Sequence, residues 1–182
     1  VGSQTFAKGL ELLKEAVPTI RRIAVLSNPA NPSHAEVARY LDASPSSLGV
    51  EIRQYRAREP ADFEGVFAAM AKDRAEALLV IADSSFGLHR SVLIALAARQ
   101  RLPAMYGLRE FPEAGGLMSY NVDARDSFRR AAVYVDRILK GARPADLPVE
   151  QPSRFELVIN RATARALGIA IPQSLLLRAE LI

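Results

Sequence analysis

Cysteine is absent from this chain of 182 residues. Its absence excludes disulfide bonds, metal sites built on thiolates and a cysteine nucleophile. The two histidines, His34 and His89, occur without any recognised metal-ligand spacing, so we predict no metal site. Neither a P-loop nor a G-x-G-x-x-G phosphate loop is present, and we therefore predict that no cofactor is bound.

Long apolar runs are also lacking. No stretch approaches the roughly 20 residues that a helix needs to span a bilayer. Residues 1–5 read VGSQT and lack the basic and apolar regions of a signal peptide, so we expect none within the printed sequence. The formal net charge is +4, but the arginines alternate with acidic residues and form no long basic run. This composition is typical of an ordinary globular protein, and we predict no nucleic-acid partner.

The sequence does not indicate a catalytic centre. His89 lies close to Asp83, Ser84 and Ser85, which together supply the residue types of a catalytic triad. Residues that follow one another within a single loop and helix rarely form a triad, and no G-x-S-x-G nucleophile elbow occurs. We interpret His89 as a surface or capping residue, and we predict that the chain is not an enzyme.

What the sequence does contain is a regular alternation of strand and helix patterns. Short apolar runs predict buried strands at residues 22–27, 77–82, 103–107, 117–120 and 155–160, and the alternating run 50–55 predicts an edge strand. Apolar residues at helical spacing predict amphipathic helices between these strands. We therefore predict an α/β fold of the flavodoxin-like kind, a parallel sheet flanked by helices on both faces.

Polar and aromatic residues follow three of the predicted strands. In open α/β sheets, ligands bind in the crevice beyond the carboxyl ends of the strands. Such a mixture of amide, carboxylate, hydroxyl, aromatic and guanidinium groups suits a small polar or zwitterionic solute. The candidate ligand-binding residues are Asn28, Asp83, Ser84, Ser85, Phe86, Tyr106 and Arg109.

Three of the candidates have an ordinary structural alternative. Asp83 and Ser84 could simply cap the following helix, as Asp and Ser often do; we favour a ligand role for Asp83 and leave Ser84 open. In the binding hypothesis Asp83 pairs with a solute ammonium group, and Phe86 and Tyr106 supply apolar walls. Arg109 either binds a carboxylate or is structural.

Several segments resemble one protein family. Residues 109–120 read REFPEAGGLMSY, residues 131–141 read AAVYVDRILKG and residues 171–179 read IPQSLLLRA. These segments, with FELVIN at 155–160 and the opening helix and strand, are similar to ABC-transporter substrate-binding proteins related to the tryptophan-binding type. The resemblance covers essentially the whole chain.

The resemblance implies a type I periplasmic-binding fold, in which two hinged α/β lobes close on a solute. Residues 1–116 would form the second lobe, residues 117–141 would return to a first lobe missing from this sequence, and residues 142–182 would cross back and add a strand and helix. Ser119, Tyr120 and Asn121 would lie at the hinge, where Asn121 replaces the glycine usual in the family. Pro45 would interrupt a helix that is usually regular.

The same resemblance implies a function. The chain would be the solute-binding component of an ABC importer, located in the periplasm or otherwise outside the cytoplasm, with a membrane permease as its partner. An amino acid, aromatic or branched, is the leading solute. The alternatives are a ligand-sensing domain of a transcription regulator or signalling receptor and, less favoured, a flavodoxin-like or Rossmann-type enzyme.

Without a first lobe, the helix at residues 126–140 would expose an apolar face made by Phe128, Ala132, Val135 and Leu139. Exposed patches of this kind drive association. We therefore predict self-association through this helix.

Overall fold

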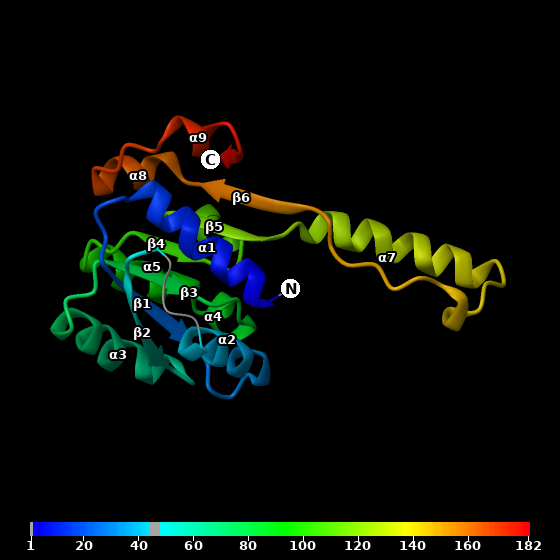
Figure 1. The fold of residues 1–182 in the computed structure, drawn as a ribbon, viewed down its shortest axis with the longest axis horizontal. Helices are drawn as coiled ribbons and strands as arrows, with labels where there is room; N and C mark the ends of the chain where they lie inside the picture. The colour runs from blue at the N-terminus through cyan, green and yellow to red at the C-terminus, as the bar shows by residue number, and fades with distance from the viewer. Residues whose placement is uncertain (1, 44–47) are drawn as a thin grey trace.

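Seven strands form one sheet within residues 2–43 and 48–182, the part of the chain that the computed structural model describes (Figure 1). The strands are β1 (Arg22–Ser27), β2 (Glu51–Arg56), β3 (Ala77–Val80), β4 (Ala104–Tyr106), β5 (Met118–Val122), β6 (Phe155–Ile159) and β7 (Ala179–Leu181). The main helices are α1 (Gly2–Ala16), α2 (Pro32–Ala43), α3 (Pro60–Lys72), α5 (Arg90–Arg99), α7 (Ala124–Leu139) and α8 (Arg161–Leu167). Shorter helices are α4 (Ser84–Leu88), α6 (Glu110–Glu113), the 3₁₀ turn η1 (Pro144–Asp146) and α9 (Gln173–Leu176).

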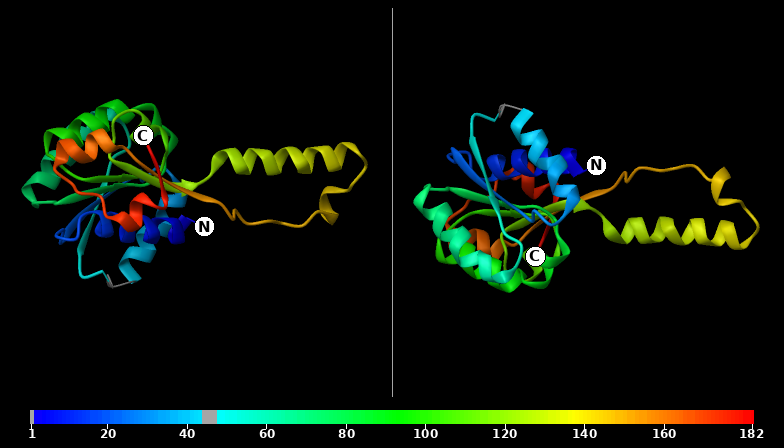
Figure 2. Two further views of the ribbon diagram at one scale, coloured as in Figure 1. Left: turned by 90° about the horizontal axis from the view of Figure 1, so that it is seen from above. Right: turned by 90° about the horizontal axis from the view of Figure 1, so that it is seen from below.

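The predicted α/β class is confirmed, because helices cover both faces of a mostly parallel sheet (Figure 2). The strand order is β2-β1-β3-β4-β5-β6-β7, and the first five strands are parallel. That order is the flavodoxin-like arrangement, in which the connections leave β1 and β3 toward opposite faces of the sheet. The crevice expected at such a switch point therefore lies beyond the carboxyl ends of β1 and β3.

Two strands at the other side of the sheet, β6 and β7, do not fit the predicted parallel sheet. β6 pairs with β5 antiparallel, so that Met118 lies opposite Ile159 and Val122 lies opposite Phe155. The chain leaves the sheet after β5 and returns in the opposite direction, which requires this antiparallel pairing. The lobe boundary predicted after residue 116 therefore falls inside the sheet, because β5 pairs with β4 as well as with β6.

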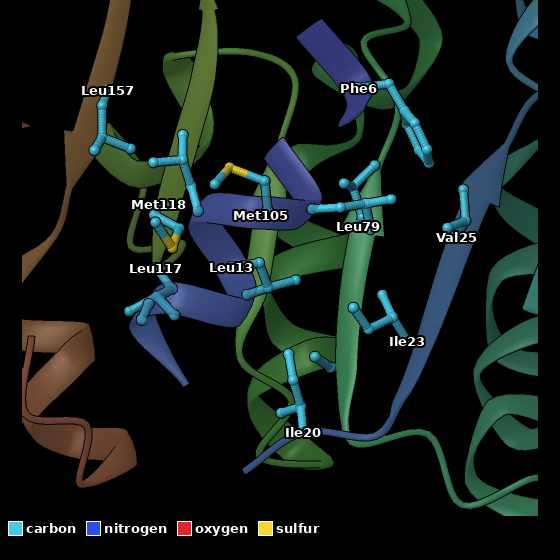
Figure 3. Packing of buried hydrophobic residues seen from close by; sticks show 14 of the residues in the cluster. Phe6, Leu13, Ile20, Ile23, Val25, Leu79, Met105, Leu117, Met118 and Leu157 are labelled. Atoms are coloured by element: carbon cyan, nitrogen blue, oxygen red, sulfur yellow. The ribbon is translucent and has the colours of Figure 1, made fainter. Parts of the chain in front are cut away.

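The core is divided by the sheet into two layers, as alternation along a strand requires. In β1, Ile23 and Val25 face one layer, whereas Ala24 and Leu26 face the other. Helix α1 covers the first layer with buried apolar side chains, and Figure 3 shows these packing on β3, β4 and β5. Helices α3 and α5 cover the second layer with Phe63, Phe67 and Leu93.

Helix α7 and the segment that follows it project from this body as an arm (Figure 1). None of the α7 side chains is buried, and Phe128 and Leu139 are 77% and 82% exposed. Contacts within the arm hold it together: Tyr134 Oη donates to the Pro148 carbonyl at 2.6 Å, and Arg130 pairs with Glu150 at 2.8 Å. The apolar face predicted for this helix is therefore exposed.

Pro45, which we expected to interrupt the helix after β1, lies outside the described residues; α2 ends at Ala43.

Candidate functional site

A hydrogen-bonded cluster joins the loops that follow β1 and β3. Its centre is Asp83, which is only 6% exposed. Asp83 Oδ1 accepts hydrogen bonds from Asn28 Nδ2 at 3.3 Å and from the Ser85 N–H at 3.0 Å. Asp83 Oδ2 accepts a hydrogen bond from Asn31 Nδ2 at 2.8 Å. The carboxylate thus bridges the crevice and caps α4 at the same time.

These donors also set the ionisation state of Asp83. Burial is the largest single influence and opposes ionisation, but the hydrogen bonds from Asn31, Asn28 and Ser85, together with the nearby His34, outweigh it. The pKa of Asp83 consequently lies below its usual value, and the group is an anion at neutral pH. Three protein donors already surround the carboxylate. The pairing of Asp83 with a solute ammonium group stays a prediction.

His34 completes the cluster from the first turn of α2. Its Nδ1 accepts a hydrogen bond from the Asn28 N–H at 2.8 Å, and its Nε2 lies 3.1 Å from the Ala82 carbonyl oxygen. Because Nδ1 accepts from the Asn28 N–H, Nε2 is the ring nitrogen that can donate to the Ala82 carbonyl. The ring is 4% exposed, so His34 is a buried link between the two loops. The sequence reasoning had given His34 no such role.

A cavity of about 170 Å³ opens beside this cluster. It lies at the carboxyl ends of β3, β4 and β5, under the first half of α1 and next to α2. The described residues that line it are Thr5, Phe6, Gly9, Ser33, His34, Val37, Leu79, Val80, Ile81, Ala82, Met105, Tyr106, Gly107, Tyr120 and Asn121. Ligand pockets commonly occupy ~300–1,000 Å³, so the cavity has the size of one part of a site.

Gly107 permits the close approach of two strand ends beside this cavity. A Cβ atom at position 107 would lie 2.5 Å from the Ala82 backbone nitrogen, which is closer than real contacts allow. The Gly107 carbonyl also accepts a short hydrogen bond from Asn121 Nδ2, which ties β5 to the loop after β4. Only glycine fits at this position without a shift of the backbone.

The predicted aromatic walls do not point where we expected. Phe86 is fully buried in the second core layer, where its ring meets the edge of Phe63 at a centroid distance of 6.0 Å. Tyr106 contributes to the cavity lining, but its ring stacks on Phe111 at 4.3 Å in that same layer. The alternation of side chains along β4 sends Tyr106 to the opposite face from Met105. Burial raises the pKa of the Tyr106 hydroxyl.

The two serines after Asp83 differ in their surroundings. Ser84 is exposed at the start of α4, and Ser85 is half-buried with its N–H used by the Asp83 cap. Neither serine is among the residues that line the cavity. His89 occupies the cap position between α4 and α5, but its side chain makes no capping hydrogen bond, and its ring lies 6.3 Å from that of Phe63.

Arg109 takes the structural role that the sequence left open. Its guanidinium pairs with Glu113 at 2.7 Å, Glu156 at 2.9 Å and Glu180 at 2.5 Å. Hydrogen bonds to Glu180, and then to Glu113 and Glu156, raise the pKa of Arg109. The side chain is only 17% exposed, and it joins α6 to the two last strands of the sheet.

The three residues predicted at the hinge all lie in β5. Ser119 is buried, and Tyr120 stacks on Phe155 of β6 at 5.8 Å. Asn121 pairs with Glu156 across the antiparallel ladder. It does not adopt a left-handed conformation; among described non-glycine residues, only Arg74 and Arg101 have positive φ. Tyr120 and Asn121 also line the cavity, so the end of β5 belongs to both features.

Sequence reasoning missed the contributions of α1 and α2 to the cavity. These helices contribute Thr5, Phe6, Gly9, Ser33 and Val37, whereas the predicted site contained only residues of loops that follow strands. The sequence feature that could have predicted this contribution is the pair of small residues at positions 5 and 9, one helical turn apart. The assembled groups can bind a small molecule by shape and hydrogen bonding.

Within residues 2–43 and 48–182, no three His, Cys, Asp or Glu side chains are placed to hold a metal ion. In the same part of the chain, no helix is both long and apolar enough to cross a membrane.

Comparison with known proteins gives a family and a set of structural relatives. A crystal structure of a conserved domain protein from Vibrio cholerae O1 biovar El Tor str. N16961 is 27% identical, with a TM-score of 0.84, and the match covers 96% of this chain and 59% of that one. An ABC domain in complex with L-Trp from Streptococcus pneumoniae is 24% identical with a TM-score of 0.84, covering 97% and 61% of the two chains. A ligand-free, open substrate-binding protein with adhesive properties from Clostridium difficile is 19% identical, with a TM-score of 0.74, over 96% and 58%.

This chain therefore spans about three-fifths of the length of those relatives, 59% and 61% for the first two. No curated protein matches it at a significant level. The family model described as ABC transporter substrate binding protein matches residues 3–182. The match covers nearly the whole sequence, and the chain belongs to the family of ABC transporter substrate-binding proteins.

Proposed function

We propose that this chain forms one side of a solute site in an ABC importer and that the solute is an amino acid or a related compound. The observation that carries the proposal is the cavity at the carboxyl ends of β3, β4 and β5, bordered by the Asn28–Asp83–His34 cluster. Ligands bind at this edge of open α/β sheets. A relative of the same fold was solved in complex with L-Trp, which supports an amino acid as the solute.

Closure of a second lobe over the cavity would complete the site. The relatives are longer than this chain, and the α7 arm presents an apolar stripe that nothing in the described residues covers. We propose that residues 123–154 reach a complementary lobe and that β5 and β6 are the crossing points. Hinge motion there would bring the two halves of the site together around the solute.

If the chain is part of an importer, its cellular location and its protein partner follow from that role. A solute-binding component of this kind works outside the cytoplasm and delivers its solute to a membrane permease. Both statements are proposals that rest on the family. Binding and delivery need no chemical change of the solute, which agrees with the non-enzymatic role that we propose.

A thermal-shift screen tests the proposal. Amino acids and small carboxylates are screened against this chain. The same compounds are screened against a longer protein that contains this sequence together with the complementary lobe. A solute at ~100 times its dissociation constant adds ~2.7 kcal/mol of stability, which raises the melting temperature by several degrees. A hit with the longer protein supports solute binding. Absence of a hit across the amino acids refutes the proposed solute class and favours a sensing role or another solute.

A further inference from the structure

The wall of the cavity formed by α1, β3 and β4 is mostly apolar, with Thr5 as its polar member. Figure 3 shows Phe6, Leu79 and Met105 close together at this place, from α1 and the two neighbouring strands. Val37 adds an apolar side chain from α2, and Tyr120 adds an aromatic side chain with a hydroxyl group from β5. Among the described residues that line the cavity, none is Asp, Glu, Lys or Arg. Such a wall suits an uncharged, apolar group.

Gly9 keeps part of this space open. The residue is buried on α1 and lines the cavity. A Cβ atom at position 9 would lie 3.5 Å from Leu79 Cδ1 and 3.5 Å from Met105 Cγ, which is ordinary van der Waals contact. A single methyl group therefore fits there, but a longer side chain would project into the space between α1 and the strands. Glycine is otherwise unfavourable inside a helix.

The size of the cavity points to an aromatic ring. Its volume is about 170 Å³. An apolar cavity of ~150 Å³ engineered in another protein stays dry and binds benzene. The charged groups of a zwitterionic solute have no ionic partner in this wall, and the nearest buried carboxylate, Asp83, already accepts three hydrogen bonds.

We propose that this cavity receives the apolar ring of the solute and that Gly9 sets the largest ring it accepts. This inference rests on the proposed function, since it names the part of the solute that this lobe recognises. The ammonium and carboxylate groups of the solute are then bound outside the apolar wall. Gly9 would then determine specificity, because the absence of a side chain at this position leaves space for the ring of the solute.

The test uses toluene and indole as uncharged probes on this 182-residue chain. Binding is followed by chemical-shift changes of the Met105 and Leu79 methyl groups and by calorimetry. The unchanged chain should bind both probes, with shifts centred on these two methyl-bearing side chains. Gly9→Leu should weaken binding of both probes by at least tenfold, because the new side chain occupies the cavity.

Gly65→Leu is the matched control. Gly65 is also a helix glycine, but a Cβ there meets nothing within 4 Å, so this change should leave probe binding unaltered. Gly9→Ala serves if Gly9→Leu fails to fold, because its Cβ makes only ordinary contacts. One added carbon in an apolar pocket changes discrimination by about tenfold or more. Gly9→Ala should therefore reduce indole affinity about tenfold and toluene affinity less.

Each outcome decides the inference. No binding by the unchanged chain, equal losses in the Gly9 and Gly65 variants, or a Gly9→Ala variant that keeps its indole affinity would overturn it. If the probes fail while the solute screen succeeds, only the ring-binding inference falls. If the probes bind as expected while the screen finds no solute, the inference about the cavity stands and the proposed function fails.

Discussion

Replacing Asp83 by Asn should destabilise the fold at neutral pH through one specific mismatch. The amide oxygen can still accept from Asn28 and Ser85, but the amide NH₂ would face the Asn31 Nδ2 donor, which lies 2.8 Å from Asp83 Oδ2. Asn31 cannot turn its amide over freely, because its Oδ1 accepts a hydrogen bond from the Ser33 N–H at 3.1 Å. Two donors would then oppose each other in a partly buried place.

The expected loss is about 1.5–3 kcal/mol, the range for a hydrogen bond to a charged group. For a chain of this size, each kcal/mol shifts the melting temperature by about 2–4 °C. Asp123→Asn is the matched control: Asp123 also caps a helix, accepting from the N–H groups of Arg125 and Asp126, and Asn caps equally well. That variant should unfold within about 0.5 kcal/mol of the unchanged chain.

The pH dependence provides a second, independent check. The pKa of Asp83 is lowered in the folded state, so its ionised form contributes stability that is fully present above the unfolded pKa of about 4. That contribution is lost as the pH falls through the lower, folded pKa. Urea unfolding at pH 7, 5 and 3.5 should therefore show a difference between Asp83→Asn and the unchanged chain that shrinks at acidic pH. A difference that is absent at pH 7, or equal at all three values, would refute the reasoning.

Three further changes test other parts of the structure. Arg109→Met leaves three carboxylates without their shared partner and should cost about 1–3 kcal/mol in urea unfolding. Arg99→Met removes an exposed ion pair and should cost clearly less, so that equal losses would contradict a structural role for Arg109. Gly107→Ala places a Cβ against the Ala82 backbone and should lower the melting temperature, while Gly65→Ala, in open space within a helix, should raise stability by about 0.5–1 kcal/mol. The exposed stripe on α7 should make this chain associate at high concentration, and Phe128→Asp should reduce that association in light scattering; a clean monomer before mutation would argue against it.

The elements of this fold could be predicted from sequence because they depend on local patterns. Continuous apolar runs such as residues 77–82 indicate strands buried on both faces, and helical spacing of apolar residues indicates the layers that cover them. The family could be recognised for the same reason, since the segment at 109–120 is contiguous. The apolar face of α7 also followed from its own spacing, whereas its exposure was expected from the missing first lobe that the resemblance implied.

Tertiary structure alone decided which side chains form the site. Asp83 and Asn28 lie 55 positions apart, and only the packing of β1 beside β3 brings them to a 3.3 Å contact. Side chains along a strand alternate between the two faces of the sheet, so tertiary structure decides which face a residue at a strand end points to. The ring of Tyr106 packs against Phe111 in the core. The partners of Arg109 on β6 and β7 likewise depend on an antiparallel return that no local pattern encodes. Sequence patterns determined the elements because secondary structure depends on near neighbours, whereas the site depended on long-range packing.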